Sequence, residues 1–454
     1  MANSQMDKDS ANDIDLLHDL IGRALKAGAD AADAVLVEGI SLSHARRLGK
    51  IEKLERSEGQ DLGLRVFLGK QQAVVSSSDR SVKALADLVE HAVAMARAVP
   101  EDEFCGIADP GQVAQDWPDH LDMLDTSEPT AETLMERAAA CEEAALGVSG
   151  VTNSEGAESG WGRSRVALAA SNGFAGAYGG SSQGVSVSVI AGSGTGMERD
   201  YDYSSAVYAA DLRDPAEIGR HAGERAVKRL GARKMPTGRF PIVFDPRVAR
   251  SMLSHLLGSI TGPSIARGTS FLKDKLGQRI FPEAINIIDD PHRPRGMRSK
   301  PFDGEGIANR RRAIIENGVL TTWLLDLRSA RQLGLTTTGH AARGTSSPPS
   351  PSAANVWLEP GAVSAEALIA DISSGFYVTE LMGQGVNGVT GDYSRGASGF
   401  WIEKGVVAFP VSEMTVAGNL KDMFQRLVAA SDLEFRNGVD SPTIRIDDLT
   451  VAGA

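Results

Sequence analysis

A short segment, Ser254-His255-Leu256-Leu257-Gly258-Ser259, brings serine and histidine together at spacings that could support chemistry. On a helix, residues four or five positions apart lie about one to one and a half turns apart, which is a layout that metal ligands can take. A catalytic zinc needs three protein ligands, usually His, Cys or carboxylate, and a general base beside the activated water. Serine hydroxyls are poor zinc ligands, and a neutral histidine is a poor substitute for a carboxylate base. We therefore predict that Ser254, His255 and Ser259 bind no metal and include no catalytic residue.

Two other kinds of catalytic site find little support in the sequence. Ser259 and His255 lie four positions apart and could touch as a nucleophile and its base. However, Ser259 does not lie in a Gly-x-Ser-x-Gly turn, the kind that exposes a nucleophilic serine. No Cys-x-x-Cys or His-x-His pair occurs either, because the only cysteines are Cys105 and Cys141 and no two histidines lie within five positions of each other. The sequence therefore contains no second local metal motif, although distant residues could still converge in space.

The segment is expected to lie on a buried amphipathic helix. Asp245 and Pro246 are typical of an N-cap and a first helical residue, since aspartate accepts free backbone N–H groups and proline needs no donor there. Apolar residues then recur at helical spacing, namely Val248, Met252, Leu253, Leu256, Leu257 and Ile260. The pattern predicts a helix that follows a short apolar strand over 241–244.

Three stretches around this helix carry a resemblance: Phe240–Asp245 before it, Arg267–Ser270 after it, and the hairpin turn Glu316-Asn317-Gly318. Together with the helix they resemble the TldD/PmbA family of peptidases. The metal-binding members of that family carry His-Glu-x-x-x-His in this helix and take a Cys from a glycine-rich loop near the C-terminus. The corresponding loop here, Asn437–Ser441, has no thiol.

The two motifs can be compared position by position. Ser254 stands at the first His of the family motif, His255 at the Glu and Ser259 at the second His. The resemblance therefore identifies the chain as the PmbA (TldE) subunit type, which lacks the metal-binding motif. A segment with Thr338, Gly339 and Arg343 resembles the family's Thr-Gly-x-x-Arg stretch, so these three residues are candidates for lining a peptide groove.

The resemblance also implies a function that depends on a partner. We expect a TldD-like, metal-bearing homologue to form a heterodimer or higher assembly with this chain and to supply zinc and catalysis. The substrates would be small or unfolded peptides. Two alternatives stay open: an independently active metallopeptidase with an unrecognised site, and a peptide-binding, chaperone-like module.

Composition limits the partners and the compartment. The chain has 454 residues and a net charge of −12, which argues against non-specific nucleic-acid binding. No apolar run is long enough to span a membrane, and the polar, acidic N-terminus does not resemble a signal peptide. Two cysteines without an obvious bridge fit a reducing compartment. We therefore expect a cytoplasmic protein without nucleic-acid or membrane partners.

Turn and periodicity signals indicate an α+β protein in two parts, with mixed, largely antiparallel sheets flanked by helices. The predicted divisions are a disordered N-terminus over 1–12, an N-terminal α+β region over 13–234 and a C-terminal TldD/PmbA-type domain over 235–454. The N-terminal region divides into a helix-sheet-helix part (13–100), a connector (101–126) and a β-rich part (127–234). Among its elements we expect separate strands over 32–37 and 42–47, and in the C-terminal domain a helix over 419–430.

Overall fold

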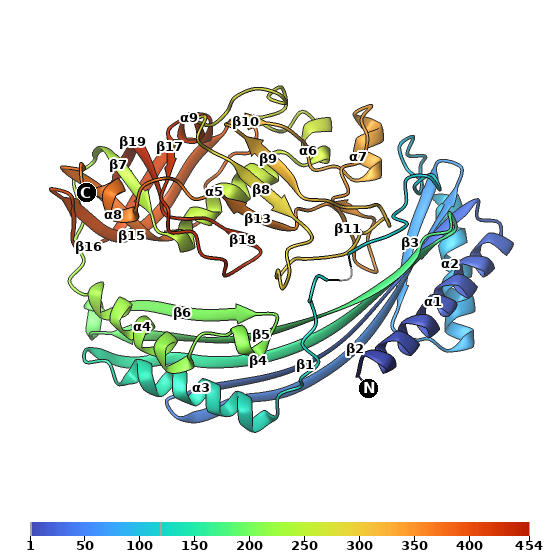
Figure 1. Ribbon diagram of the computed structural model, residues 1–454, viewed down its shortest axis with the longest axis horizontal. Coiled ribbons are helices and arrows are strands. Elements are labelled where there is room, and N and C mark those ends of the chain that lie inside the picture. Colours follow the sequence, from blue (N-terminus) through green and yellow to red (C-terminus); the bar gives the residue numbers. More distant parts are fainter. Residues whose placement is uncertain (1, 119, 454) are drawn as a thin grey trace.

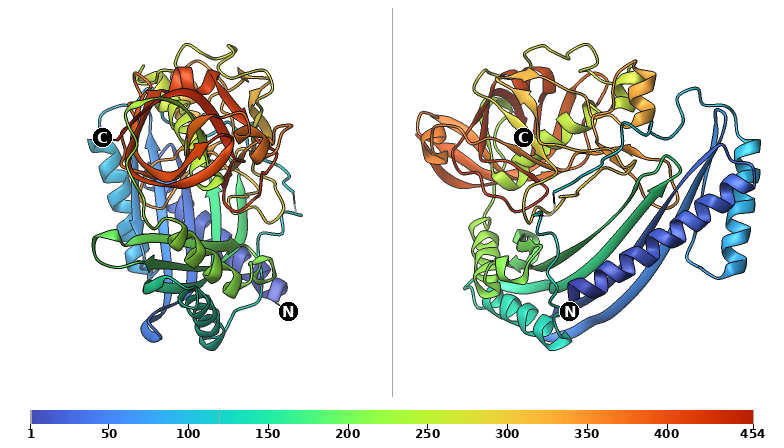
Figure 2. Two further views of the ribbon diagram at one scale, coloured as in Figure 1. Left: turned by 90° about the vertical axis from the view of Figure 1, so that its left-hand side faces the viewer. Right: turned by 45° about the vertical axis from the view of Figure 1, so that its right-hand side comes forward.

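The computed structural model describes residues 2–118 and 120–453 and has two parts (Figure 1). The N-terminal region is one long, curved sheet with helices on its convex side. The C-terminal domain lies against the concave side of that sheet, as the views in Figure 2 also show. Nearly all strand pairs are antiparallel, so the predicted α+β class with largely antiparallel sheets is confirmed. Within the described residues, no helix is both long and apolar enough to cross a membrane.

The N-terminal region is built on a six-stranded antiparallel sheet in the order β3-β2-β1-β4-β5-β6. Its elements are α1 (Ala2–Lys26), β1 (Ala31–Arg47), β2 (Lys50–Leu68), β3 (Gln71–Ser77), α2 (Val82–Ala98), α3 (Ala131–Leu146), β4 (Val151–Ala170), β5 (Ala175–Ala191), η1 (Gly194–Gly196), β6 (Glu198–Ala206), η2 (Ala209–Asp211) and α4 (Pro215–Lys228). The sheet runs through both the 13–100 and the 127–234 parts. These two parts therefore share one structural unit.

Alternation along the strands separates the two faces of this sheet. In β1, Leu36 packs under α1 and α2, and Leu42, on the same face, packs against Leu134 of α3. Val35 points the other way and joins a cluster with Phe302 of the C-terminal domain. All four helices therefore cover one face, and the opposite, concave face receives the C-terminal domain (Figure 1).

The C-terminal domain contains a small barrel and a second sheet. Its elements are β7 (Gly238–Phe244), α5 (Pro246–Ser259), α6 (Gly262–Ala266), β8 (Ile287–Asp290), β9 (Arg312–Glu316), β10 (Val319–Leu320), α7 (Leu327–Gln332), β11 (Ala341–Ala342), β12 (Ser350–Pro351), β13 (Asn355–Leu358), α8 (Ala365–Ile369), β14 (Ser374–Met382), β15 (Asp392–Glu403), β16 (Val406–Asn419), α9 (Leu420–Gln425), β17 (Leu427–Ala429), β18 (Val439–Asp440) and β19 (Ile444–Ala452).

Strands β16-β15-β14-β7-β19 pair in that order, and pairing of β16 with β19 closes the ring visible in the left view of Figure 2. The other sheet has the order β10-β9-β8-β13-β18. Helix α5 contributes Met252, Leu253 and Leu256 to a core that also contains Phe376 of the barrel and Ile287 of the second sheet. The helix that carries the motif is therefore held from both sides.

The prediction of disorder over 1–12 is wrong for residues 2–12, which belong to α1, while Met1 lies outside the described residues. No proline interrupts this stretch, and extending an existing helix costs much less free energy than starting one. The strands expected over 32–37 and 42–47 form the single strand β1. Gly39 between them pairs with Gly59 on one side and Ser164 on the other, so both neighbours hold it in the sheet.

Two differences concern the end of the chain. The helix expected over 419–430 stops at Gln425, because Leu427–Ala429 leave it to pair with β19. Strand β16 was not expected from the sequence. Pro410 and the polar residues after it interrupt the alternation, and the structure accommodates them through register shifts and a positive φ of 53° at Glu413.

Candidate functional site

The start of α5 is defined by the predicted cap. The side chain of Asp245 accepts a hydrogen bond from the backbone N–H of Arg247 at 3.1 Å, and Pro246 occupies the first turn. The Asp245 carboxylate also accepts a hydrogen bond from the hydroxyl of Tyr377 at 3.0 Å. These contacts fix where α5 begins, and hence which residues of the motif face the core.

The three motif residues have different surroundings. Ser254 is exposed, and its Oγ lies 3.3 Å from the carbonyl oxygen of Arg250. Ser259 is buried and donates its hydroxyl proton to the carbonyl oxygen of His255 at 2.8 Å. The hydroxyl of Ser259 is therefore bonded to the backbone of His255 and not to its ring. This geometry does not support a serine nucleophile activated by that histidine.

The ring of His255 lies against Tyr393, edge to face, with 6.0 Å between the centroids. Its Nε2 atom is buried without a hydrogen-bond partner. Burial, together with the positive charge of Arg395, lowers the pKa of His255 to about 4. The side chain is therefore neutral at physiological pH and packs as a half-buried aromatic group.

These residues do not fit a zinc ion. Two of the three helix positions hold hydroxyls, and the third holds an imidazole beside an arginine, whose charge opposes a nearby divalent cation. In the loop over 437–441 the only anionic side chain is that of Asp440, which accepts hydrogen bonds from the backbone and side-chain nitrogens of Asn437. Nowhere among residues 2–118 and 120–453 do three His, Cys, Asp or Glu side chains gather in a group that could hold a metal ion.

The structure nevertheless brings the two motif segments together. Ser254 and the residues Asn437, Gly438 and Val439 line one cavity of about 760 Å³ between the N-terminal sheet and the C-terminal domain. Glu380 is the only acidic residue in its lining, against six arginines: Arg199, Arg247, Arg250, Arg298, Arg395 and Arg436. The cavity beside Ser254 is therefore strongly cationic.

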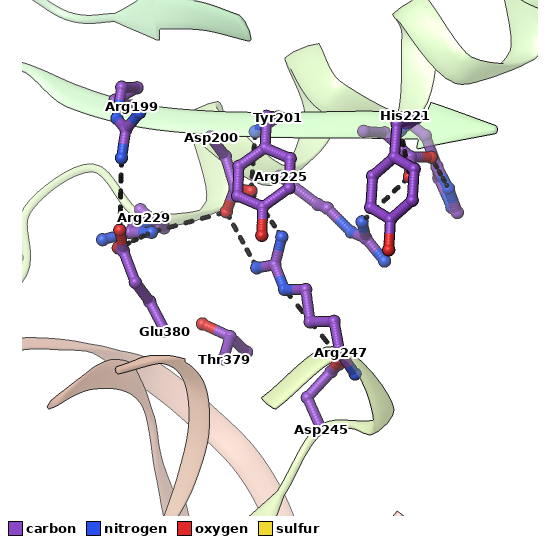
Figure 3. Close-up of polar contacts among 12 residues, drawn as sticks. Arg199, Asp200, Tyr201, His221, Arg225, Arg229, Asp245, Arg247, Thr379 and Glu380 are labelled. Carbon is purple, nitrogen blue, oxygen red and sulfur yellow. Dashed lines mark hydrogen bonds and ion pairs between the residues drawn. The ribbon is translucent and has the colours of Figure 1, made fainter. Parts of the chain in front are cut away.

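Ion pairs between the two parts of the chain form one wall of this cavity (Figure 3). Arg247 of α5 binds Asp200 of β6 through both guanidinium nitrogens, at 2.7 and 3.1 Å. Arg229, which follows α4, reaches Glu380 of β14 at 2.7 Å, and Arg199 of β6 reaches the same carboxylate at 3.3 Å. Since these pairs link β6 and α4 to the C-terminal domain, they fix the shape of the cavity.

The three groove candidates lie elsewhere. The side chain of Arg343 is only 2% exposed and binds Asp33 of β1 at 2.6 Å. Thr338 accepts a hydrogen bond from the backbone N–H of Leu325 at 2.8 Å, and Gly339 adopts a φ of 70°. None of the three lines the 760 Å³ cavity. Their role in a peptide groove stays a prediction.

The arginines of the cavity were not expected from the sequence. Only Arg247 and Arg250 lie close together in the chain, and their spacing of three positions on a helix that carries the motif was the available signal. The other four come from a strand of the first sheet, a loop, a barrel strand and the loop before β18. These four arginines come together only when distant strands pair, so no local sequence pattern predicts that they share a cavity.

The chain matches three domain models of one class of protein. Residues 32–96 match the model described as PmbA/TldA metallopeptidase domain 1, residues 124–230 match the central domain, and residues 237–453 match the C-terminal domain. This is the domain set of a metallopeptidase family, and it covers most of the sequence. The chain belongs to the PmbA/TldD peptidase family.

Relatives and solved structures agree with this assignment. The chain is 36% identical to metalloprotease PmbA of Escherichia coli O157:H7 over 96% of both sequences, and 37% identical to a PmbA homologue of Haemophilus influenzae over 95% of this chain and 94% of that one. A candidate modulator of DNA gyrase from Bacteroides thetaiotaomicron has a TM-score of 0.89 at 28% identity, covering 97% of this chain and 98% of that one. TldE of Thermococcus kodakarensis, at 21% identity, has the same fold, with a TM-score of 0.85 over 96% of this chain and 100% of that one.

Proposed function

We propose that this chain is the PmbA/TldE-like subunit of a two-subunit peptidase in which a TldD-like homologue supplies the zinc ion and the cleavage chemistry. The observation that carries the proposal is the donor set of the degenerate motif. Ser254, His255 and Ser259 stand where metal-binding members have their helix ligands and base, and the loop over 437–441 offers no thiol. A neutral imidazole beside Arg395 supports the same conclusion, because that charge opposes a bound cation.

The substrates of this complex would be small or unfolded peptides. An extended peptide can add to an exposed strand by backbone hydrogen bonds, and β6 is an edge strand of the N-terminal sheet beside the cavity. We place the complex in the cytoplasm, in keeping with two buried, free cysteines.

The decisive experiment compares the chain alone with the chain co-purified with a TldD-like homologue from the same genome. Bound zinc and the cleavage of an unfolded peptide are measured for each preparation. We expect neither in the isolated chain, and both in the complex. A complex with a partner whose metal-binding histidines are replaced serves as the control and should lose zinc and cleavage while still assembling.

The alternative of an independently active metallopeptidase is favoured by the names of the relatives, which describe metalloproteases. Stoichiometric zinc and cleavage in the isolated chain would establish that alternative and overturn the proposal. Peptide binding without cleavage, in a chain that forms no complex with the homologue, would instead indicate a peptide-binding module.

A further inference from the structure

The cationic cavity contains charges that the fold itself does not use. Arg199, Arg247 and Arg436 each have a carboxylate partner: Glu380, Asp200 and Glu434, respectively. For Arg250, Arg298 and Arg395 no carboxylate lies within ion-pair distance among the described residues. Three unneutralised guanidinium groups thus line one cavity of a protein whose net charge is −12.

Two of these three side chains are positioned by hydrogen bonds to backbone carbonyl oxygens. Arg250 donates from Nε to the carbonyl oxygen of Arg247 at 3.1 Å, and Arg395 donates to the carbonyl oxygen of Leu381 at 3.4 Å. The Nε atom of Arg395 is buried with no partner. These contacts leave other guanidinium N–H groups available to a ligand.

The side chain of Arg298 lies directly over Gly438. A Cβ atom at position 438 would lie 2.4 Å from Cδ of Arg298 and 2.5 Å from its Nε. A side chain at position 438 would displace the Arg298 side chain, so glycine allows it to lie across the loop. The charge of Arg298 therefore lies over the loop of residues 437–441.

The cavity continues along the concave sheet. A second cavity of about 520 Å³ shares Met297 with it, and a third of about 380 Å³ shares Ser205. Small residues of the sheet, such as Gly39, Ser41 and Gly162, line the second cavity. Because small residues allow a second backbone to approach closely, the combined space suits an extended chain better than a compact ion.

We propose that this cavity is a binding site for the carboxylate groups of an acidic peptide, held by Arg250, Arg298 and Arg395. The inference rests on the proposed role of the chain in a peptidase complex and adds a substrate class to it. Guanidinium groups bind carboxylates through paired, charge-assisted hydrogen bonds. The carboxylates come either from Asp and Glu side chains or from the C-terminus of the peptide, and the two sources can be separated by experiment.

The test uses the full chain and three fluorescein-labelled, unstructured Gly-Ser peptides, with binding followed by fluorescence anisotropy. One peptide ends in two glutamates, the second has glutamines in their place, and the third keeps the glutamates but has an amidated C-terminus. We expect the glutamine peptide to bind about tenfold more weakly than the first. A loss confined to the amidated peptide would identify the C-terminal carboxylate as the bound group. Rising salt should weaken the binding of the acidic peptide.

Variants connect this preference to the cavity. R250Q, R298Q and R395Q should each weaken the binding of the glutamate peptide by about tenfold. R220Q, which changes an exposed arginine of α4 outside the cavity, should leave binding unchanged. Circular dichroism checks folding, and because Arg298 is largely exposed, R298Q remains informative if the variant of the more buried Arg395 unfolds.

Equal binding of all three peptides, or equal binding by all variants, would overturn the inference. Displacement of the peptide by inorganic phosphate at lower concentrations than by unlabelled glutamate peptide would also overturn it, in favour of a phosphate site. The proposed function is judged separately, from zinc and cleavage. A complex with the homologue that cleaves acidic and neutral peptides equally well would contradict the inference and leave the subunit role intact.

Discussion

Arg247 and Asp200 form a two-pronged ion pair, with N–O distances of 2.7 and 3.1 Å, between the first turn of α5 and the edge strand β6. The Asp200 side chain is 3% exposed. Burial alone would raise the pKa of this carboxyl, but hydrogen bonds and charge from Arg247 hold it below its usual value. The pair therefore joins the two parts of the chain beside the motif helix.

Replacing Asp200 with asparagine should destabilise the protein by about 3 kcal/mol, because it leaves the buried Arg247 with only Asp245, at 3.9 Å, as a charge partner. Urea unfolding measures the difference. D211N is the matched control. Its partner is Arg295, and both side chains are about 40% exposed (41% and 42%), so the loss there should stay below about 1 kcal/mol. Equal losses in the two variants would contradict the structural role of the buried pair.

A second contact between the two parts depends on Gly63 of β2. A Cβ atom there would lie 2.2 Å from the carbonyl oxygen of Thr345, which is backbone that cannot rotate away. We expect G63A to lower the free energy of unfolding by at least about 2 kcal/mol. In the same strand, nothing lies within 4 Å of a Cβ at Gly59, so G59A should change stability little. The thermal unfolding midpoints of both variants test the difference, and an unshifted midpoint for G63A would show that the two parts do not pack as described.

Protonation of His255 should destabilise the folded chain. Burial and the charge of Arg395 lower its folded pKa to about 4, below the unfolded value of about 6.5. The folded state therefore resists taking up the proton, and stability should fall as pH decreases from about 6.5 towards 4, by at most about 3 kcal/mol. Partial exposure of the ring reduces this loss.

Urea unfolding at pH 7 and pH 5 measures this effect. H255Q should show a smaller drop in stability between the two pH values than the unchanged protein. H91Q, on an exposed position of α2, should keep the full drop. An identical pH dependence in all three proteins would mean that His255 does not contribute to it.

Arg343 was predicted to line a peptide groove, whereas the structure places it in a buried ion pair with Asp33, which Arg65 also binds at 3.0 Å. The charges of both arginines hold the pKa of Asp33 below its usual value against the effect of burial. R343M should cost about 3 kcal/mol of stability, and R310M, at an exposed position, should cost almost nothing. If R343M keeps full stability and the complex containing it loses peptide cleavage, the groove assignment is favoured instead.

Local sequence patterns predicted some helix starts correctly. Asp245-Pro246 predicted the start of α5, because a capping carboxylate and a proline act within one turn, and the same pair of residue types, Asp214-Pro215, begins α4. The long strands were harder to predict. Glycines such as Gly39 and Gly160 interrupt the alternation of apolar and polar residues along the chain. These positions stay extended because they pair with a neighbouring strand on each side.

Part of the candidate site could be predicted from the sequence and part could not. The degenerate motif could be identified from residues on one helix. The charge of the cavity could not, because Arg250, Arg298 and Arg395 are contributed by a helix, a loop and a barrel strand that meet only in the folded domain. The burial of Arg343 could not be predicted from the sequence either, because its partner Asp33 lies more than three hundred positions earlier in the chain.

Closure of the barrel sets an order for folding during synthesis. Strand β7 begins the C-terminal domain, yet one of its two neighbours is β19, which also seals the ring against β16. The ribosome therefore releases β7 and the motif helix long before their last partner exists. The sheet and helices of residues 2–228 can assemble meanwhile, because their strands pair only with one another. Until β19 emerges, β7 and β16 expose unpaired backbone, and the nascent chain is most vulnerable to aggregation and most in need of chaperones.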